Sequence, residues 1–196
     1  MSHVDKKKQI NSIIISVSLV ALSGFLVNIA NMVTILVPIE EKMIVNLVLY
    51  IVACMLGFAI LPYVFVCKVI YSGKMPKCNI STKRTVIILL VMLMIFIRSA
   101  EKYSLIHNLV IGTTEEILFR YIIISVLLKC FDKKHAFIIG SLIFSLILHM
   151  NGEFIINFVT KFPTSLILYY LTDKYGIQDS VFLHWGYNSL VGYFMN

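Results

Sequence analysis

Charged residues are scarce in this chain. Asp, Glu, Lys and Arg make up 14% of its 196 residues, whereas apolar residues make up 59%. A soluble domain carries roughly 25% charged residues, so this chain lacks the polar surface that solubility in water requires. The composition therefore predicts an integral membrane protein. No break in composition divides the chain, which favours a single domain over residues 1–196.

Two further absences exclude whole classes of protein. The four cysteines form neither a CxxC pair nor a zinc-type spacing, which predicts reduced, structural thiols. A basic stripe with interleaved aromatics is also missing, so the net charge of +7 does not indicate a nucleic-acid partner. The basic residues gather instead at 6–8, 68–84 and 129–134, before or between apolar runs. Basic residues in alternate loops predict a lipid bilayer around the chain and those loops on its inner side.

Long apolar runs are what the chain does have, and they predict its fold. About 20 consecutive apolar residues cross a bilayer as a helix. We therefore expect an all-α fold, a polytopic bundle of about seven transmembrane helices in the cell membrane with the C-terminus outside. The expected helices are 10–37, 44–71, 85–97, 115–131, 135–150, 153–171 and 181–196, with a mixed stretch at 101–114 before the fourth.

The first polar group inside an expected helix is a pair of glutamates followed by an arginine. An ionisable residue in a membrane helix costs about 2.5–3.5 kcal/mol on insertion scales, so one that persists faces a cavity or a partner. Glu116 and Arg120 are four residues apart and can pair on one helical face. Glu115 lies about 100° around the helix and stays available as a general base. Alternatively, Thr113 and Glu116 have the spacing of a capping box that begins a helix.

Two further groups stand on other expected helices. His149 closes an apolar helix, where it is either a site residue or an interfacial residue that meets water. His184 and Asn188 are four residues apart and share a helical face. An imidazole and a carboxamide can donate to an oxyanion, and they can equally hydrogen-bond to a neighbouring helix. So much polarity on three helices of one small bundle favours a shared interior site.

The motif order Glu-Glu-x-x-x-Arg, a His that ends an apolar helix, and His-x-x-x-Asn resembles the CAAX protease and bacteriocin-processing (Abi) family of intramembrane proteases. Within that family the chain is similar to the type II CAAX prenyl endopeptidases. The resemblance covers 113–196, whereas 1–112 agrees only in being hydrophobic helices. Two positions depart from the family's pattern. Ser145 stands where a Phe is usual, with Phe144 one residue earlier, and Tyr121 stands where a glycine often follows the arginine.

The resemblance implies hydrolysis of a peptide bond within or near the membrane. The substrate would be a membrane-embedded or lipidated peptide or protein. Glu115 would activate water as the general base, and His149 would help to hold that water. His184 and Asn188 would stabilise the oxyanion of the tetrahedral intermediate.

The resemblance also bears on supporting residues and on metal. Glu116 would belong to the catalytic residues, and Arg120 would be a supporting residue. Together they would hold the other site residues in place. The family has been described as metalloproteases, so Glu115, His149 and His184 are candidate ligands for a divalent metal such as zinc. The chain has no HExxH helix, and water activated by glutamate without metal is an equal alternative.

Two other functions fit the same sequence. A non-catalytic membrane protein that confers bacteriocin immunity or scaffolds a regulatory partner would need the bundle but no general base. A transporter could use buried Glu and His residues to relay ions, although the chain lacks the internal repeat of many carriers.

Counting residues from the inner loops places the site residues at different heights in the bilayer. The helical rise puts Glu115 and His149 about 22–26 Å above the inner face, but His184 only about 15 Å. Helix tilt, an unwound stretch at 176–179 or a break at Pro163 would close this gap.

Overall fold

The structure is a computed structural model, and it describes residues 6–36, 42–148 and 154–195. These residues form helices and no strand, which confirms the all-α prediction. Several elements join end to end, some of them π-helical (η), so that the described chain has seven continuous helical stretches. The elements are α1 (Lys6–Ile35), α2 (Lys42–Cys54), η1 (Met55–Ile60), α3 (Leu61–Phe65), η2 (Val66–Ile70), α4 (Thr82–Arg98), α5 (Lys102–Glu116), η3 (Ile117–Ile123), α6 (Ile124–Leu127), α7 (Lys133–Ile143), η4 (Phe144–Leu148), α8 (Phe154–Tyr175) and α9 (Ile177–Met195).

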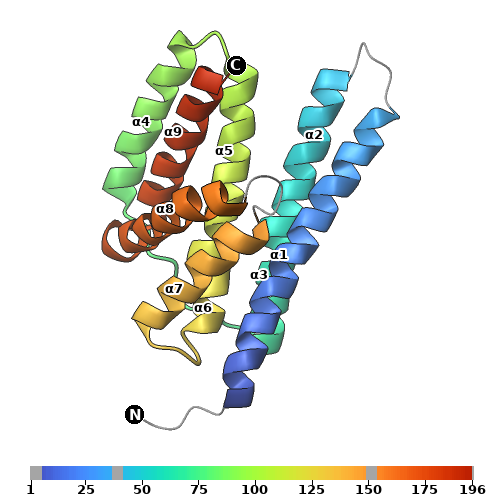
Figure 1. Cartoon of the computed structure of the whole chain (residues 1–196). Coiled ribbons are helices and arrows are strands. Elements are labelled where there is room, and N and C mark those ends of the chain that lie inside the picture. Colours follow the sequence, from blue (N-terminus) through green and yellow to red (C-terminus); the bar gives the residue numbers. More distant parts are fainter. Residues whose placement is uncertain (1–5, 37–41, 149–153, 196) are drawn as a thin grey trace.

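The helices form two groups that meet near the middle of the molecule (Figure 1). One group is the antiparallel pair of α1 with the stretch α2 to η2, and the other contains α4, α5 and α9. α6 and α7 lie at the end of the molecule where α1 begins, and α8 runs across the other helices. The beginning of α1, the end of η2 and the α6–α7 turn all lie at this end, which is called the lysine-rich end below.

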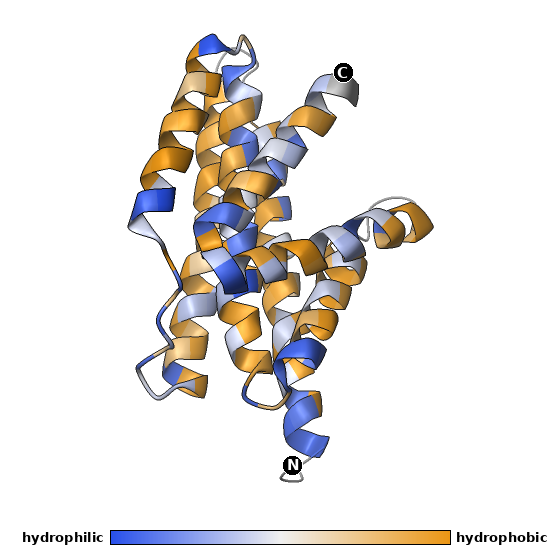
Figure 2. Ribbon diagram, turned by 90° about the vertical axis from the view of Figure 1, so that its left-hand side faces the viewer, coloured by the Kyte–Doolittle hydropathy of each residue, from blue (hydrophilic) through white to orange (hydrophobic). Residues whose placement is uncertain are grey.

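Three described helices are long and apolar enough to cross a membrane: Lys6–Ile35, Lys42–Ile70 and Phe154–Tyr175. Large apolar side chains are exposed along α1, α2 and α4, and their outer faces are hydrophobic in Figure 2. A soluble protein rarely exposes such extensive apolar surface, and a lipid environment accommodates it. The chain is therefore a membrane protein, and the number of helices that cross the bilayer stays a prediction.

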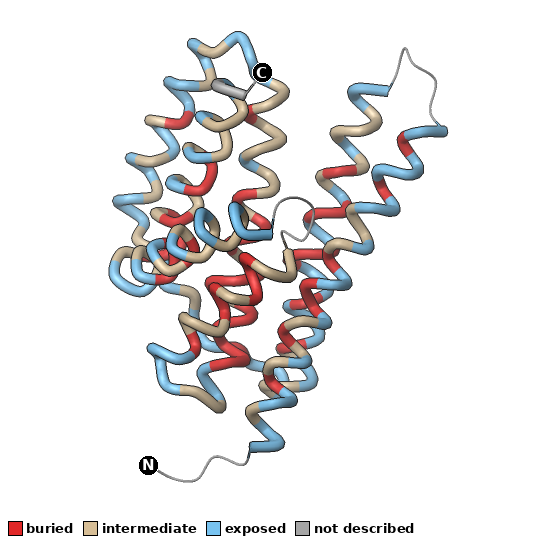
Figure 3. Tube along the Cα trace, in the orientation of Figure 1, coloured by how far each residue is buried: buried red, intermediate tan, exposed pale blue. Residues whose placement is uncertain are grey.

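The buried core lies where η3 and α6 pack between α1 and the η4 turn (Figure 3). Leu118, Phe119, Ile122 and Ile123 are all completely buried there. Small residues bring α1 close to η1: Ser23 Oγ donates to the carbonyl of Gly57 at 2.7 Å. Close approach through small residues and hydrogen bonds is the usual way in which helices associate inside a membrane.

The expected start of the fourth helix is wrong. Residues 102–127 form one continuous helix through α5, η3 and α6, so Glu115 lies in its interior. The hydroxyl of Thr114 donates to the carbonyl of Val110 within the helix, which satisfies a side chain that otherwise favours turns. The capping box predicted from Thr113 and Glu116 therefore does not exist.

The glycine in the same stretch lies where α5 and α9 pack together. A Cβ on Gly112 would lie 3.5 Å from the backbone nitrogen of Trp185, in ordinary van der Waals contact. Trp185 in turn donates its indole N–H to the carbonyl of Leu105 at 3.1 Å. α9 therefore lies directly against α5 at this point, with enough room for an alanine at position 112.

A tight turn at Gly176 joins α8 to α9. Gly176 has φ +110°, a left-handed conformation that favours glycine. The next residue, Ile177, donates its N–H to the carbonyl of Asn79 at 3.0 Å, and Asp179 pairs with Arg84. These contacts dock the turn onto the segment that precedes α4 and onto the first turn of α4. Pro163 does not break α8, which continues through it.

Candidate active site

Glu116 and Arg120 form a buried ion pair one helical turn apart. Arg120 Nε lies 3.1 Å from Glu116 Oε2, and both side chains are completely inaccessible to solvent. The pairing agrees with the prediction from their spacing. Because an uncompensated charge in such a place is very unfavourable, each residue depends on the other.

Aromatic rings surround the guanidinium of Arg120. Its central carbon lies 4.2 Å from the ring centroid of Tyr169, 5.1 Å from that of Phe144 and 5.8 Å from that of Phe119. Rings in these positions attract the cation, most strongly where water is excluded. Sequence reasoning missed Tyr169, because a tyrosine in an apolar run carries no functional signal. Phe144 faces the cluster although it stands one residue before the family's usual position.

His184 connects this pair to Glu115. Its Nδ1 lies 2.9 Å from Glu116 Oε1, and its Nε2 lies 3.6 Å from Glu115 Oε2. The first distance is a hydrogen bond, and the second is longer than one. His184 and Glu115 are both buried, 6% exposed each. Arg120, Glu116, His184 and Glu115 thus form one continuous buried chain of polar contacts.

The height gap between Glu115 and His184 is closed by the arrangement of the last two helices. α8 runs across the bundle instead of along it (Figures 1 and 2), and the turn at Gly176 then directs α9 back along α5. The close approach at Gly112 places the His184 imidazole beside α5, where a Cβ on Gly112 would lie 3.8 Å from its Cγ. No break at Pro163 is involved.

One predicted site residue, Asn188, is not part of this chain of contacts. Asn188 lies one turn beyond His184 and is half-buried, and no hydrogen bond joins it to any residue that the structure describes. His149 lies outside the described residues.

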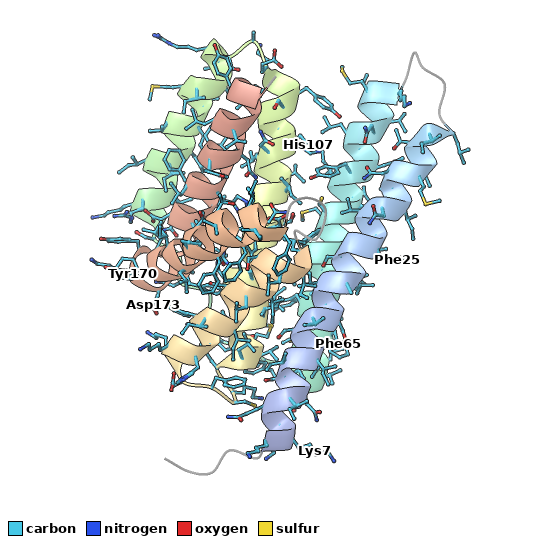
Figure 4. The ribbon with its side chains drawn as sticks, in the orientation of Figure 1. Lys7, Phe25, Phe65, His107, Tyr170 and Asp173 are labelled. Carbon is cyan, nitrogen blue, oxygen red and sulfur yellow. The ribbon has the colours of Figure 1, made fainter. Side chains whose placement is uncertain are left out.

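Another polar residue, Lys161, interacts with Glu115 without having been predicted. Lys161 of α8 is half-buried, lies 5.3 Å from the ring centroid of Tyr187, and interacts electrostatically with Glu115. A lone lysine in an apolar helix is itself a signal of an interior role, so the sequence offered a reason to include it. Elsewhere on α5, His107 faces α2 (Figure 4) and stacks on Tyr50, with the ring centroids 3.9 Å apart.

The described residues do not by themselves make up a metal site. No group of three or more His, Cys, Asp or Glu side chains that could hold a metal occurs within residues 6–36, 42–148 and 154–195. Catalytic zinc usually takes three protein ligands, and here Glu115 and His184 supply two. His149, the third candidate, lies outside the described part of the chain, so metal dependence stays an open prediction.

Comparison with known families gives one match, and it covers the region that contains the site. Residues 103–190 match the family model described as "Rce1-like: Type II CAAX prenyl endopeptidase Rce1-like". The match spans slightly less than half of the chain and includes every predicted site residue. This confirms the resemblance to the CAAX protease and bacteriocin-processing family. No curated protein and no solved structure matches the chain.

Proposed function

We propose that this chain is an intramembrane endopeptidase that hydrolyses a peptide bond in a membrane-associated protein or peptide, with Glu115 as the base that activates water. The observation that carries the proposal is the buried chain of contacts from Arg120 through Glu116 and His184 to Glu115. The Rce1-like match at 103–190 supports it, because that family is one of endopeptidases.

The contacts assign different tasks to the two adjacent glutamates. Glu116 has its charge balanced by Arg120 and accepts the Nδ1–H of His184, which orients the imidazole. Glu115 has no arginine within salt-bridge distance among the described residues. His184 Nε2 lies 3.6 Å from its carboxylate, and Lys161 of α8 interacts with it electrostatically. Glu115 is therefore the carboxylate left to take a proton from water.

The same geometry sets a condition on His184. Because Nδ1–H is directed to Glu116, a neutral imidazole presents a lone pair at Nε2. Only the imidazolium has a proton on Nε2 to donate. Stabilisation of an oxyanion by His184 therefore requires the doubly protonated ring, with Glu116 as its counter-charge.

A large apolar cavity beside the cluster supports a membrane-associated or lipidated substrate. It has a volume of about 1160 Å³ and lies between α4, α5 and α9. Leu183 and Trp185, which flank His184 on α9, both line it, and so do Leu105 and Phe182. The cavity is large enough to bury the apolar part of a substrate close to the turn that carries His184.

Replacement of Glu115 tests the proposal. Glu115→Gln keeps the shape of the side chain but removes the base, so we expect peptide cleavage to fall by about 10²–10⁴. Glu101→Gln, at the exposed start of α5, is the matched control and should retain wild-type cleavage. Purified proteins in detergent are incubated with a quenched peptide library and with membrane extracts, and products are identified by mass spectrometry. A folded Glu115→Gln protein that still cleaves at the wild-type rate would contradict the assignment.

A non-catalytic function, such as bacteriocin immunity or scaffolding of a regulatory partner, is the second candidate. The observation that favours it is that both ring nitrogens of His184 already face carboxylates, as in a purely structural cluster. This reading requires that wild type and Glu115→Gln are equally inert towards peptides while both still protect cells or bind the partner. Cleavage of peptides by the wild type but not by Glu115→Gln would exclude the non-catalytic function.

A further inference from the structure

Lys161 brings a positive charge from α8 to the candidate active site. α8 runs across the other helices (Figure 1), and Lys161 lies in its first half. The ammonium of Lys161 lies 5.3 Å from the ring centroid of Tyr187 on α9 and interacts electrostatically with Glu115 on α5. It therefore faces the two helices that carry Glu115 and His184.

The charge of Lys161 is not taken up by an ion pair. In the part of the chain that the structure describes, no carboxylate lies within ion-pair distance of its ammonium. The carboxylate of Glu115 acts on it from beyond that distance. An ammonium in an apolar helix is costly unless it faces a partner or a cavity, and one that persists there is a candidate for a functional role.

Lys161 also differs from the buried ion pair in its accessibility. The side chains of Glu116 and Arg120 are completely inaccessible to solvent. Lys161 is only half-buried, and Glu115 keeps 8% of its side chain exposed. A group of a bound substrate can therefore reach Lys161 and Glu115 but not Arg120.

The proposed hydrolysis creates a negative charge that this ammonium can balance. Glu115 takes a proton from water while the water oxygen bonds to the carbonyl carbon of the substrate, and an electron pair of the C=O bond moves to the carbonyl oxygen. The C–N bond then breaks as the C=O bond re-forms, and the leaving nitrogen takes the proton from Glu115. A positive charge beside the oxyanion lowers the barrier to its formation.

We propose that Lys161 stabilises this oxyanion. The proposal rests on the proposed function, because no oxyanion forms without peptide hydrolysis. In the resting site the ammonium is attracted to the carboxylate of Glu115. Once Glu115 has taken the proton of water, the oxyanion is the negative charge that the attraction of Lys161 passes to. Lys161 therefore acts on the transition state and little on the bound substrate.

Lys161 meets a need that the neutral imidazole of His184 cannot meet. Nδ1–H of His184 is directed to Glu116, so the neutral ring has no proton on Nε2 to donate. An ammonium carries both the charge and protons to donate. Stabilisation of the oxyanion therefore does not depend on His184 being doubly protonated.

Replacement of Lys161 tests the proposal. Lys161→Met removes the charge but keeps an unbranched apolar side chain, so α8 should still fold. The quenched peptide that wild type cleaves fastest serves as substrate in detergent, and thermal unfolding is compared in the same detergent. We expect kcat to fall by about 10²–10³, as on loss of other oxyanion donors, with KM nearly unchanged. Lys161→Arg keeps a positive charge and should lose clearly less.

Lys174→Met is the matched control. It makes the same change in the last turn of α8, where the exposed Lys174 ammonium donates to the hydroxyl of Tyr170 at 3.0 Å. It should cleave like wild type. A folded Lys161→Met protein with the wild-type kcat overturns the proposal. A loss that lies entirely in KM, or one that Lys174→Met shares, overturns it as well.

A second measurement distinguishes a charge at the oxyanion from a purely structural lysine. A peptide aldehyde made from the cleaved sequence adds water to form a tetrahedral hydrate, whereas the matching peptide alcohol cannot. We expect Lys161→Met to weaken inhibition by the aldehyde about 10–10²-fold, because the hydrate carries only part of the charge of the oxyanion. Inhibition by the alcohol should stay unchanged. Equal weakening of both inhibitors would make Lys161 a structural residue.

The result for Lys161 is distinguishable from the result for the proposed function. Cleavage that is lost in Glu115→Gln but kept in Lys161→Met leaves the proposed function intact and rejects the role of Lys161. Loss of kcat in both variants, with Lys174→Met unchanged, supports both. A wild type that cleaves no peptide rejects both, because no oxyanion then forms.

Discussion

Glu116 shows what a single residue does at this site. Its two carboxylate oxygens face different partners, Oε2 towards Arg120 and Oε1 towards His184. One side chain thereby neutralises a buried cation and orients an imidazole. The i,i+4 spacing predicted the first contact. The second depends on a helix that begins more than sixty residues later, which no local pattern could indicate.

Removal of either partner of the buried pair should destabilise the protein strongly. Glu116→Gln and Arg120→Met should each lower the free energy of unfolding by about 3–5 kcal/mol, because each leaves the other charge buried and unpaired. The double variant should lose clearly less than the sum of the two. Equilibrium unfolding in mixed detergent micelles measures all four proteins. Strictly additive losses would contradict a direct interaction between the two residues.

At the scale of the helices, close approaches place the cluster. Tyr169 of α8 reaches across to α7, where its hydroxyl lies over Gly140, and it donates to the carbonyl of Phe119 in η3 at 3.2 Å. The same ring covers Arg120. The contact between α7 and α8 therefore sets the position of the ring that encloses the buried arginine.

Gly140→Ala tests this contact. A Cβ at Gly140 would lie 2.1 Å from Tyr169 Oη, and the ring is completely buried, so it cannot simply move away. We expect a loss of about 1–3 kcal/mol of stability, as in other overpacked cores. Gly24→Ala is the matched control in α1, since nothing lies within 4 Å of its added Cβ, and it should gain about 0.5–1 kcal/mol from helix propensity. Thermal unfolding in detergent separates the two outcomes.

The start of α7 offers a test with pH. Asp132 caps this helix by accepting the backbone N–H of His135, and this bond, with the His135 side chain, lowers the pKa of Asp132 from its usual 3.8. A lowered pKa in the folded state means that the contribution is present above pH 3.8 and is lost as the pH falls through the lowered value. Asp132→Ala should therefore lower the melting temperature at pH 7 and converge with wild type in acid. A difference that stays constant down to low pH would exclude the cap as its cause.

Across the whole molecule, the helices place the two ends of the chain apart. The beginning of α1 lies at the lysine-rich end, and the last turn of α9 lies at the opposite end (Figure 1). Lysine-rich loops remain on the inner side of a membrane, so the arrangement agrees with the expected outside C-terminus.

Reporter fusions test this orientation. A reporter that is active only inside should work when it is fused before α1, and one that is active only outside should work when it is fused after α9. Activity of the same reporter at both ends would require an even number of crossings and would contradict the predicted orientation. Replacement of Lys6, Lys7 and Lys8 by Gln should weaken the preference, because these residues bias insertion.

The sequence by itself determined the medium, the fold class and one contact of the candidate site, the pair of Glu116 and Arg120. A chain with few charges and long apolar runs is stable as helices in lipid. The free-energy cost of burying Glu116 and Arg120 in lipid already indicated that the two side chains pair. Such inferences hold because they depend on composition or on neighbours within one helical turn. Roles in catalysis and metal dependence stay predictions.

Tertiary structure alone decided where the helices begin and how the polar residues meet. Gly112 and the threonines after it resemble a turn, yet contact with α9 and hydrogen bonds inside the helix keep 102–127 continuous. Because α8 runs across the bundle, its Tyr169 covers Arg120. The same arrangement decides that Glu116 is the carboxylate that accepts a hydrogen bond from His184. Contacts between residues far apart in sequence depend on the packing of whole helices, and no spacing along the chain encodes that packing.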